Sequence, residues 1–212
     1  MSDSIFDVTM VELPANVPVL SFSSVFLFPG TKVNLRIYEM RYIRLVFNAL
    51  ASSRIIGMVQ PKETNMSMKT PELYKTGCAG RISSFTESGD TLLITLTGIS
   101  RFNVLKETSH NGIYQDATID FSPFAQDFNL EEFKFNKKEL FNKVDFYAYS
   151  NKIDLTSDML QQLPHDQILM SLAMLLPFTA TEKQALLECP DLQKFYDTLL
   201  LLLDMNSEGR IN

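Results

Sequence analysis

The chain has 212 residues, with 19 Lys and Arg against 25 Asp and Glu, so its formal net charge is −6 and its pI is near 5.0. This acidic balance argues against a protein that binds nucleic acid by releasing counterions from phosphates. Hydrophobic residues make up 45% of the chain, which excludes intrinsic disorder, and the apolar run at residues 199–203 is far shorter than the roughly 20 residues that cross a bilayer.

The first part of the chain, up to about residue 122, alternates short β-type segments with turn signals. We predict a helix whose apolar face carries Met40, Ile43, Val46 and Leu50, because these residues recur at steps of three and four. Strands are predicted at residues 17–28, 32–37, 54–60, 77–87, 91–97, 101–106 and 113–121. Short strands with one helix indicate a closed or nearly closed β-barrel.

Glycine and proline mark the turns between these strands. Pro29 fixes φ and lacks an N–H, and Gly30 permits a positive φ, so the strand that ends at Phe28 is expected to stop there in a tight turn. The sequence Ser88-Gly89-Asp90 predicts a hairpin turn, and Gly98 predicts a bulge or bend in the strand that follows.

After Pro123 the pattern becomes helical, and capping residues indicate where the helices begin. Asn129 with Glu132, and Thr179 with Glu182, have the spacing of a capping box. Further helices are expected at about 156–163, at 167–176 after a cap at Asp166, and from 192 to about 204 after a cap at Asp191. The second half is therefore predicted to be a bundle of four or five helices.

Four segments stand out in order along the chain. They are the turn Phe28-Pro29-Gly30 with the following LRIYEMRY sequence, the strand GCAGRI at 77–82, the strand LTGISRF at 96–102, and SLAMLLPF at 171–178 followed by EKQALLE at 182–188. Together they resemble the substrate-binding N-terminal domain of Lon proteases over about residues 17–203. Asn34 and Tyr38 depart from the Pro and Phe that are usual in that family.

The resemblance implies an α+β fold in two domains. The first is a PUA-like β-pseudobarrel with one helix at about residues 15–122, and the second is a C-terminal α-helical bundle at about residues 128–205. The resemblance also implies a non-catalytic recognition module, as in stand-alone bacterial members of the family. Lon proteases need ATPase and peptidase modules as well, which 212 residues cannot hold beside these domains.

The polar loop at residues 61–75 is the candidate substrate-binding surface. Its Met66 and Met68, together with Leu73 and Tyr74, would form a rim that repacks around varied clients, because Met side chains are flexible and polarisable. The alternative interpretation is a solvated connector.

The other residues of the signature have a structural interpretation beside a functional one. They are Phe28, Pro29, Gly30, Glu39, Arg41, Tyr42, Gly80, Arg81, Gly98 and Arg101. We expect turn geometry to explain the Pro and Gly of the first motif. Glu39, Arg41 and Arg101 form either a recognition site or an internal ion-pair network that ties the helix to the barrel, and the internal network is favoured.

No catalytic or metal-binding pattern is present in the sequence. It contains no G-x-x-x-x-G-K-[ST] phosphate loop, and His165 beside Asp166 does not form a triad, because triad partners come from separate elements. Cys78 and Cys189 have neither disulfide nor metal-ligand spacing. The acidic N-terminus lacks the pattern of a signal peptide. We therefore expect a soluble, cytoplasmic protein that is not an enzyme and has no cofactor, metal or membrane contact.

Three functions are consistent with the sequence. The leading hypothesis is a module that binds exposed apolar polypeptide segments or a protein partner. The second is an adaptor or assembly domain that binds one folded partner. The third is RNA binding, which PUA-like folds suggest but the acidic charge opposes.

Overall fold

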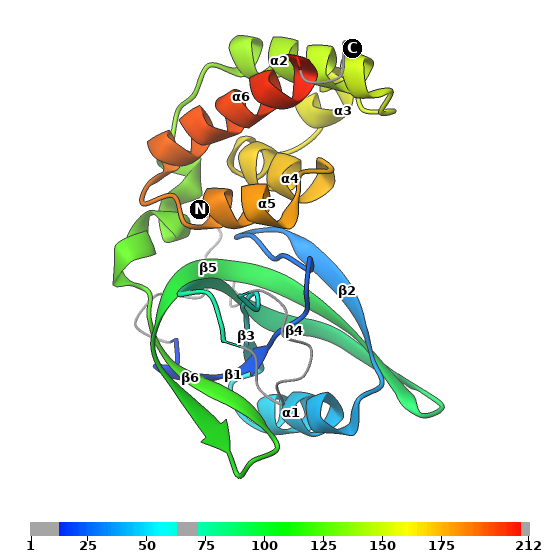
Figure 1. The fold of residues 1–212 in the computed structure, drawn as a ribbon, viewed down its shortest axis with the longest axis vertical. Helices are drawn as coiled ribbons and strands as arrows, with labels where there is room; N and C mark the ends of the chain where they lie inside the picture. The colour runs from blue at the N-terminus through cyan, green and yellow to red at the C-terminus, as the bar shows by residue number, and fades with distance from the viewer. Residues whose placement is uncertain (1–12, 63–71, 209–212) are drawn as a thin grey trace. The chain divides into compact units, whose positions relative to one another are not determined.

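The computed structural model describes residues 13–62 and 72–208. The chain divides into two compact units, one up to Phe128 and the other from Asn129 onward. Figure 1 shows that strands make up most of the first unit and helices the second. The α+β class expected from the sequence is thus confirmed.

The first unit is built on a six-stranded sheet with one helix. In the described part of the chain its elements are β1 Asn16–Leu20, β2 Lys32–Ile37, α1 Met40–Leu50, β3 Ile55–Met58, β4 Thr76–Ser88, β5 Thr91–His110 and β6 Tyr114–Asp120. The strand order is β2-β5-β4-β3-β1-β6, and a further β5–β6 pairing closes the sheet into a pseudobarrel. Only the β1–β3 pair among these is parallel.

Strand β5 holds the barrel together because it pairs with β2, β4 and β6. Its 20 residues were expected as two strands, at 91–97 and 101–106, and the structure corrects this to one continuous strand. The irregularity predicted at Gly98 is present: Gly80 lies opposite Gly98 and Ala79 opposite Ser100, so Ile99 is an extra residue. A bulge of this kind bends a strand without ending it.

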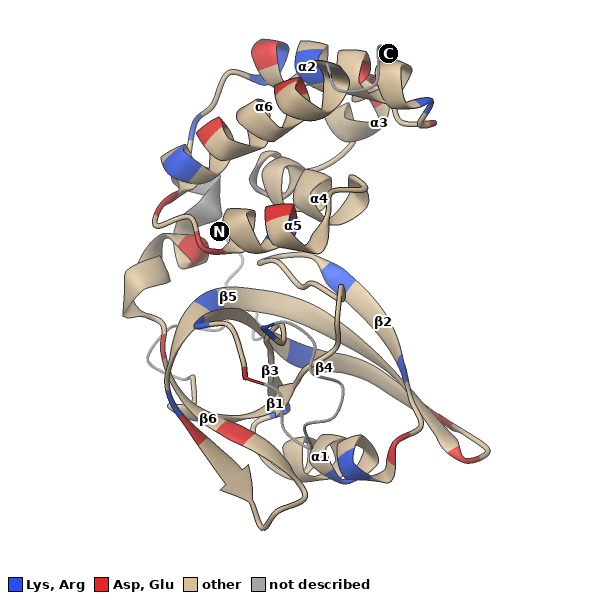
Figure 2. Ribbon diagram, viewed as in Figure 1, with Lys and Arg blue, Asp and Glu red and all other residues tan. Residues whose placement is uncertain are grey.

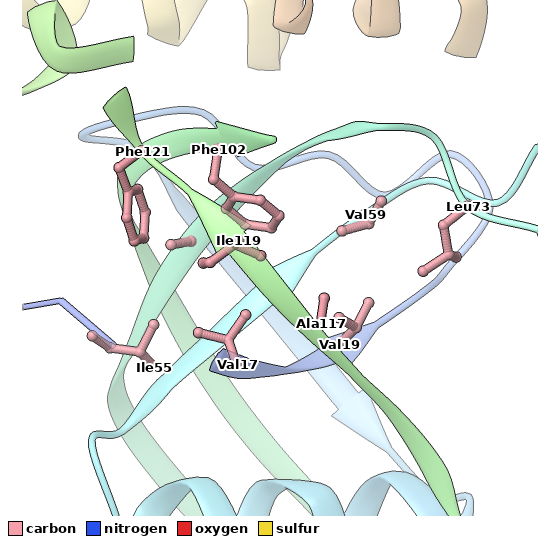
Figure 3. Packing of buried hydrophobic residues seen from close by; sticks show 10 residues of the cluster. Val17, Val19, Ile55, Val59, Leu73, Phe102, Ala117, Ile119 and Phe121 are labelled. Atoms are coloured by element: carbon pink, nitrogen blue, oxygen red, sulfur yellow. The ribbon is translucent and has the colours of Figure 1, made fainter. Parts of the chain in front are cut away.

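The barrel core gathers apolar side chains from β1, β3, β4, β5 and β6 (Figure 3). Its buried members are Val17, Val19, Ile55, Val59, Leu73, Ala79, Phe102, Ala117, Ile119 and Phe121. Phe102 and Phe121 meet edge to face, with ring centroids 6.1 Å apart. Burying each large side chain contributes roughly 1.5–3 kcal/mol, so this cluster stabilises the packing of these strands.

Helix α1 occupies the predicted segment but turns a different face to the barrel. Its buried residues are Tyr42, Leu45, Val46 and Ala49. Of the predicted face, Val46 is buried and Ile43 and Leu50 are half-buried, whereas the prediction for Met40, which is 63% exposed, is wrong. Tyr42 fixes this rotation: its ring packs edge to face on Phe22 and its hydroxyl donates to the Ser21 carbonyl. A Tyr side chain can bury its ring while its hydroxyl keeps a hydrogen-bond partner, so Tyr42 lies in the core and Met40 faces outward.

The second unit is helical. Its segments are α2 Lys137–Asn151, α3 Ser157–Gln161, the 3₁₀ turn η3 His165–Gln167, α4 Ile168–Leu175, α5 Ala180–Leu187 and α6 Leu192–Glu208, after the 3₁₀ segment η2 Ser122–Glu132. Helices α2 and α6 are joined by an ion pair between Lys143 and Asp204 and by a hydrogen bond from Asn151 to the carbonyl of Asn206. The helical bundle expected for this half is therefore present.

Two of the predicted caps are confirmed and two are wrong. Thr179 and Glu182 form the complete capping box of α5, and the Asp191 carboxylate accepts from the backbone N–H of Lys194 at 2.7 Å. Residues 129–132 instead lie in η2, and the cap of α2 is Asn136, whose side chain accepts from the Glu139 N–H. The N-cap of α4 is Gln167 and not Asp166, because residues 165–167 form a 3₁₀ turn.

Candidate functional site

The first signature segment is a tight turn held by hydrogen bonds between its own residues. Gly30 has a φ of 73°, as predicted, and Phe28 and Pro29 are buried. The Thr31 hydroxyl donates to the Phe28 carbonyl at 2.8 Å and accepts from the Phe28 N–H at 3.1 Å. The turn leaves Phe28 in the core and directs the chain into β2.

Gly98 holds the same turn from β5. Its N–H donates to the Thr31 carbonyl at 2.8 Å, and its carbonyl accepts from the Gly30 N–H at 3.0 Å. A Cβ at residue 98 would lie 2.1 Å from the Phe28 carbonyl oxygen, and one at Gly80 would lie 2.6 Å from a Leu27 methyl carbon. The signature glycines therefore permit close backbone packing.

Glu39, Arg41 and Tyr42 form a local group at the start of α1. The Arg41 Nε–Glu39 Oε2 distance is 2.8 Å, with 41% and 39% of the two side chains exposed. The Arg41 guanidinium lies 4.5 Å from the Tyr42 ring centroid, and burial raises the pKa of Tyr42. This exposed ion pair connects residues only two positions apart, so it does not join the helix to the barrel as the predicted network would.

Arg101 is fully buried, and it pairs with Asp127, a partner that sequence reasoning missed. Arg101 donates from Nη2 to Oδ1 at 2.8 Å and from its backbone N to Oδ2 at 2.8 Å, and neither side chain has exposed surface. Its guanidinium lies 4.5 Å from the Phe124 ring centroid. This buried pair ties η2 to the barrel, whereas the network favoured from the sequence joined Arg101 with Glu39 and Arg41 and tied the helix to the barrel. Arg81 is half-buried in β4 and lies outside this pair.

The candidate substrate-binding residues lie at and around the gap in the described chain. Met66 and Met68 lie outside the described residues. Leu73 is 3% exposed and belongs to the barrel core, whereas Tyr74 is half-buried against that core. An isolated bridge from Pro61 to Leu73 joins the two ends of the loop. In the described part, the loop therefore contributes packing through Leu73.

A groove of about 580 Å³ lies beside the β5–β6 hairpin and is bordered by β1 and α1. His110 Nδ1 lies 2.9 Å from Asp116 Oδ2, and the His110 ring stacks on Tyr114 at 4.5 Å. The Asn48 amide donates to the Tyr114 hydroxyl at 2.7 Å. Because these polar groups are already paired with one another, the groove offers few open hydrogen-bonding positions to a ligand.

Large apolar side chains are exposed at the end of the sheet where β2 leads into α1. We call Tyr38, Met40 and Leu93 the apolar end surface. Tyr38 is 71% exposed and Met40 63%, and Leu93 lies opposite Arg36, two positions before Tyr38. The exposure of Tyr38 could have been predicted from the sequence, because exposed Asn34, Arg36 and Tyr38 alternate with buried Leu35 and Ile37. The exposure of Met40 was not predicted, because the predicted helix face placed this residue in the core.

The described residues hold no group of three or more His, Cys, Asp or Glu side chains that could bind a metal ion. Burial raises the pKa of the Cys78 thiol well above its usual value, which keeps it protonated. Among the helices of the described chain, none combines the length and apolar character needed to span a bilayer.

Sequence comparison connects this geometry to known proteins. A model of the family described as ATP-dependent protease La (LON) substrate-binding domain matches residues 16–204. The chain is 25% identical over 203 residues to Lon protease 2 of Myxococcus xanthus and, to the same extent, to the Lon protease of Anaeromyxobacter dehalogenans. Each alignment covers 93% of this chain and 24% of the relative, so the chain spans about a quarter of these curated relatives.

Solved structures show the same fold. The Lon N-terminal domain protein of Xanthomonas campestris superposes with a TM-score of 0.64 at 20% identity, over 88% of this chain and 97% of that one. The N-terminal domain of the Mycobacterium avium complex Lon protease gives 0.63 at 17%, over 92% and 99%. The fold is therefore that of PUA-like Lon N-terminal domains, and the chain belongs to the Lon substrate-binding domain family.

Proposed function

We propose that this chain is a non-catalytic recognition module that binds polypeptides with exposed apolar segments. The observation that carries the proposal is the exposure of Tyr38 and Met40 at the end of the barrel. Exposed apolar patches on soluble proteins commonly mark interaction sites. Membership in a substrate-binding family supports a polypeptide as the ligand. Met66 and Met68, on the loop that follows β3, remain a second proposed contact.

The test is the affinity for a permanently unfolded client, prepared by reducing and alkylating a disulfide-containing protein. Replacing Tyr38 and Met40 together by Ser should weaken binding at least tenfold. Each side chain of this size contributes about 1.5–3 kcal/mol when it is buried, and about 1.4 kcal/mol is a factor of ten. Fluorescence anisotropy of the labelled client measures the change.

Leu105 provides the matched control, because it is 62% exposed on β5 and lies outside the apolar end surface. Leu105→Ser should leave client affinity within twofold. A joint Met66→Ser and Met68→Ser variant tests the loop separately. Equal binding by the parent, the Tyr38/Met40 variant and the loop variant would remove both proposed contacts, and preference for the same protein in its folded form would indicate an adaptor instead.

The purified chain is also expected neither to hydrolyse ATP nor to cleave casein. This expectation rests on the missing phosphate-loop sequence and on the family match, which is to the substrate-binding module. Phosphate release and the appearance of acid-soluble peptides are the measurements. Turnover that survives repurification and disappears on mutation of a single residue of this chain would contradict the proposal.

A further inference from the structure

The geometry points to the open edge of β2 as the place where a client is held: we propose that an extended polypeptide segment with alternating apolar and acidic residues pairs with β2 as an added antiparallel strand. This inference rests on the proposed function and names the form of its ligand. It concerns the backbone of β2 and adds to the side chains of the apolar end surface.

The edge is open because β2 is the last strand of the sheet. It pairs with β5 on one side, and none of the strands in residues 13–62 and 72–208 pairs with its other side. Every other strand has partners on both sides along at least part of its length. Barrel closure through β5 and β6 therefore leaves β2 outside the closed ring.

The hydrogen-bonding register shows which backbone groups face this edge. A two-residue turn joins Ser88 to Thr91, so Ser88·Thr91 is a hydrogen-bonded pair of β4 and β5, and so by alternation is Thr86·Leu93. The N–H and carbonyl groups of Leu93 and Thr95 thus point to β4. Those of their intervening neighbours Leu92, Ile94 and Leu96 point to β2.

The same alternation on β2 assigns its free row. Leu96, Ile94 and Leu92 lie opposite Val33, Leu35 and Ile37, which therefore bond to β5. The donation of the Gly98 N–H to the Thr31 carbonyl, two residues before Val33, agrees with this register. The backbone groups of Lys32, Asn34 and Arg36 consequently face away from the sheet, into the open edge.

The side chains along the edge define the chemistry of the ligand. Lys32, Asn34 and Arg36 are exposed on the outer face, so this face has two positive charges on one short strand (Figure 2). On the other face Val33 is half-buried beside the buried Leu35 and Ile37. An added strand extends both faces, so acidic side chains would meet Lys32 and Arg36 while apolar ones pack beside Val33.

Backbone pairing also suits the task of the proposed function. An added strand obtains its affinity from main-chain hydrogen bonds, which are independent of sequence, and its preference from alternate side chains. An unfolded client presents such extended segments, whereas a folded protein has already paired its strands internally.

The experiment uses the full chain and a fluorescein-labelled peptide of about ten residues, the length of a long strand, in which Leu alternates with Glu. In an antiparallel pair the residues opposite Lys32 and Arg36 exchange the hydrogen bonds. N-methylation of the Glu residues should therefore weaken binding at least tenfold, and N-methylation of the Leu residues should change it less than twofold. Equal affinity of all three peptides would overturn strand addition.

Two protein variants complete the test. Asn34→Pro removes a backbone N–H that faces the open edge, and Pro is tolerated at such positions of an edge strand. Binding of the Leu/Glu peptide should weaken at least tenfold, and circular dichroism verifies that the variant is folded. Joint Lys32→Glu and Arg36→Glu replacement should reverse the binding preference, so that a Leu/Lys peptide binds more tightly than the Leu/Glu peptide. Misfolding of the variant could not produce such a reversal. If the basic row only guards the edge against pairing, neither peptide binds either protein.

The outcomes separate this inference from the proposed function. If the parent and Asn34→Pro bind the unfolded client equally well, the edge inference is wrong and the recognition proposal stands. If the parent does not bind the unfolded client at all, both fail.

Discussion

Replacing Asp127 by Ala should lower the free energy of unfolding by about 3–5 kcal/mol, because the change leaves the Arg101 guanidinium buried without its counter-charge. Both side chains are fully buried, two of the hydrogen bonds between them are 3.0 Å or shorter, and the Arg101 backbone N–H donates to Asp127 at 2.8 Å. Urea denaturation measures the loss, and circular dichroism is the suitable probe because the chain has no Trp.

The exposed pair at Glu39 and Arg41 is the matched control. Its ion-pair distance is also 2.8 Å, but both side chains are about two-fifths exposed, so Glu39→Ala should cost less than about 1 kcal/mol. Joint replacement of Arg101 by Met and Asp127 by Leu should recover much of the lost stability, since no charge then remains buried. A loss below about 1 kcal/mol for Asp127→Ala would show that the pair does not support the fold.

Gly98→Ala is expected to cost about 3 kcal/mol or more, the upper end of the cost of overpacking. The added methyl would lie 2.1 Å from the Phe28 carbonyl oxygen and 2.8 Å from its carbon. These are backbone atoms held by the turn, so they cannot rotate away as a side chain would. The same urea titration measures the effect.

Gly89 supplies the control for this substitution. It lies at the β4–β5 turn with a φ of 58°, and a Cβ added there would have no atom of another part of the described chain within 4 Å. Gly89→Asn should therefore cost less than about 1 kcal/mol, because Asn adopts the left-handed region at small cost. Equal losses at residues 89 and 98 would contradict the close approach at Gly98.

Local signals in the sequence were sufficient for much of the fold. Thr179 and Glu182 satisfy each other's backbone within one turn, and the positive φ of Gly30 follows from its place after Pro29. The same local rule failed at Asn129, because Asn136 and Glu139 have the same spacing seven residues later and lie where the α-helix begins. Spacing alone does not distinguish a 3₁₀ segment from the first turn of a helix.

The features that sequence reasoning missed depend on residues far apart in the chain. Asp127 lies 26 positions after Arg101 in a segment without a strong periodic pattern, so nothing local links the two. The exposure of Met40 depends on Tyr42 reaching the Ser21 carbonyl, 21 positions earlier. The open edge of β2 depends on β5 pairing with three strands, which follows from the topology of the whole barrel.

The position of β1 in the barrel has a consequence for how the chain folds. Its Asn16 lies opposite Thr118 of β6, 102 positions later, and their side chains are hydrogen-bonded. The hairpins β4–β5 and β5–β6 form between neighbours in sequence, but the β1–β6 pair requires a long loop to close first, and such non-local pairing slows folding. During synthesis β1 can pair with β3 early, but its other edge has no partner until β6 leaves the ribosome. Until then its core residues Val17 and Val19 also lack the side chains of β6 against which they pack. Closure of the barrel by β1 and β6 should therefore be the slow step of its assembly.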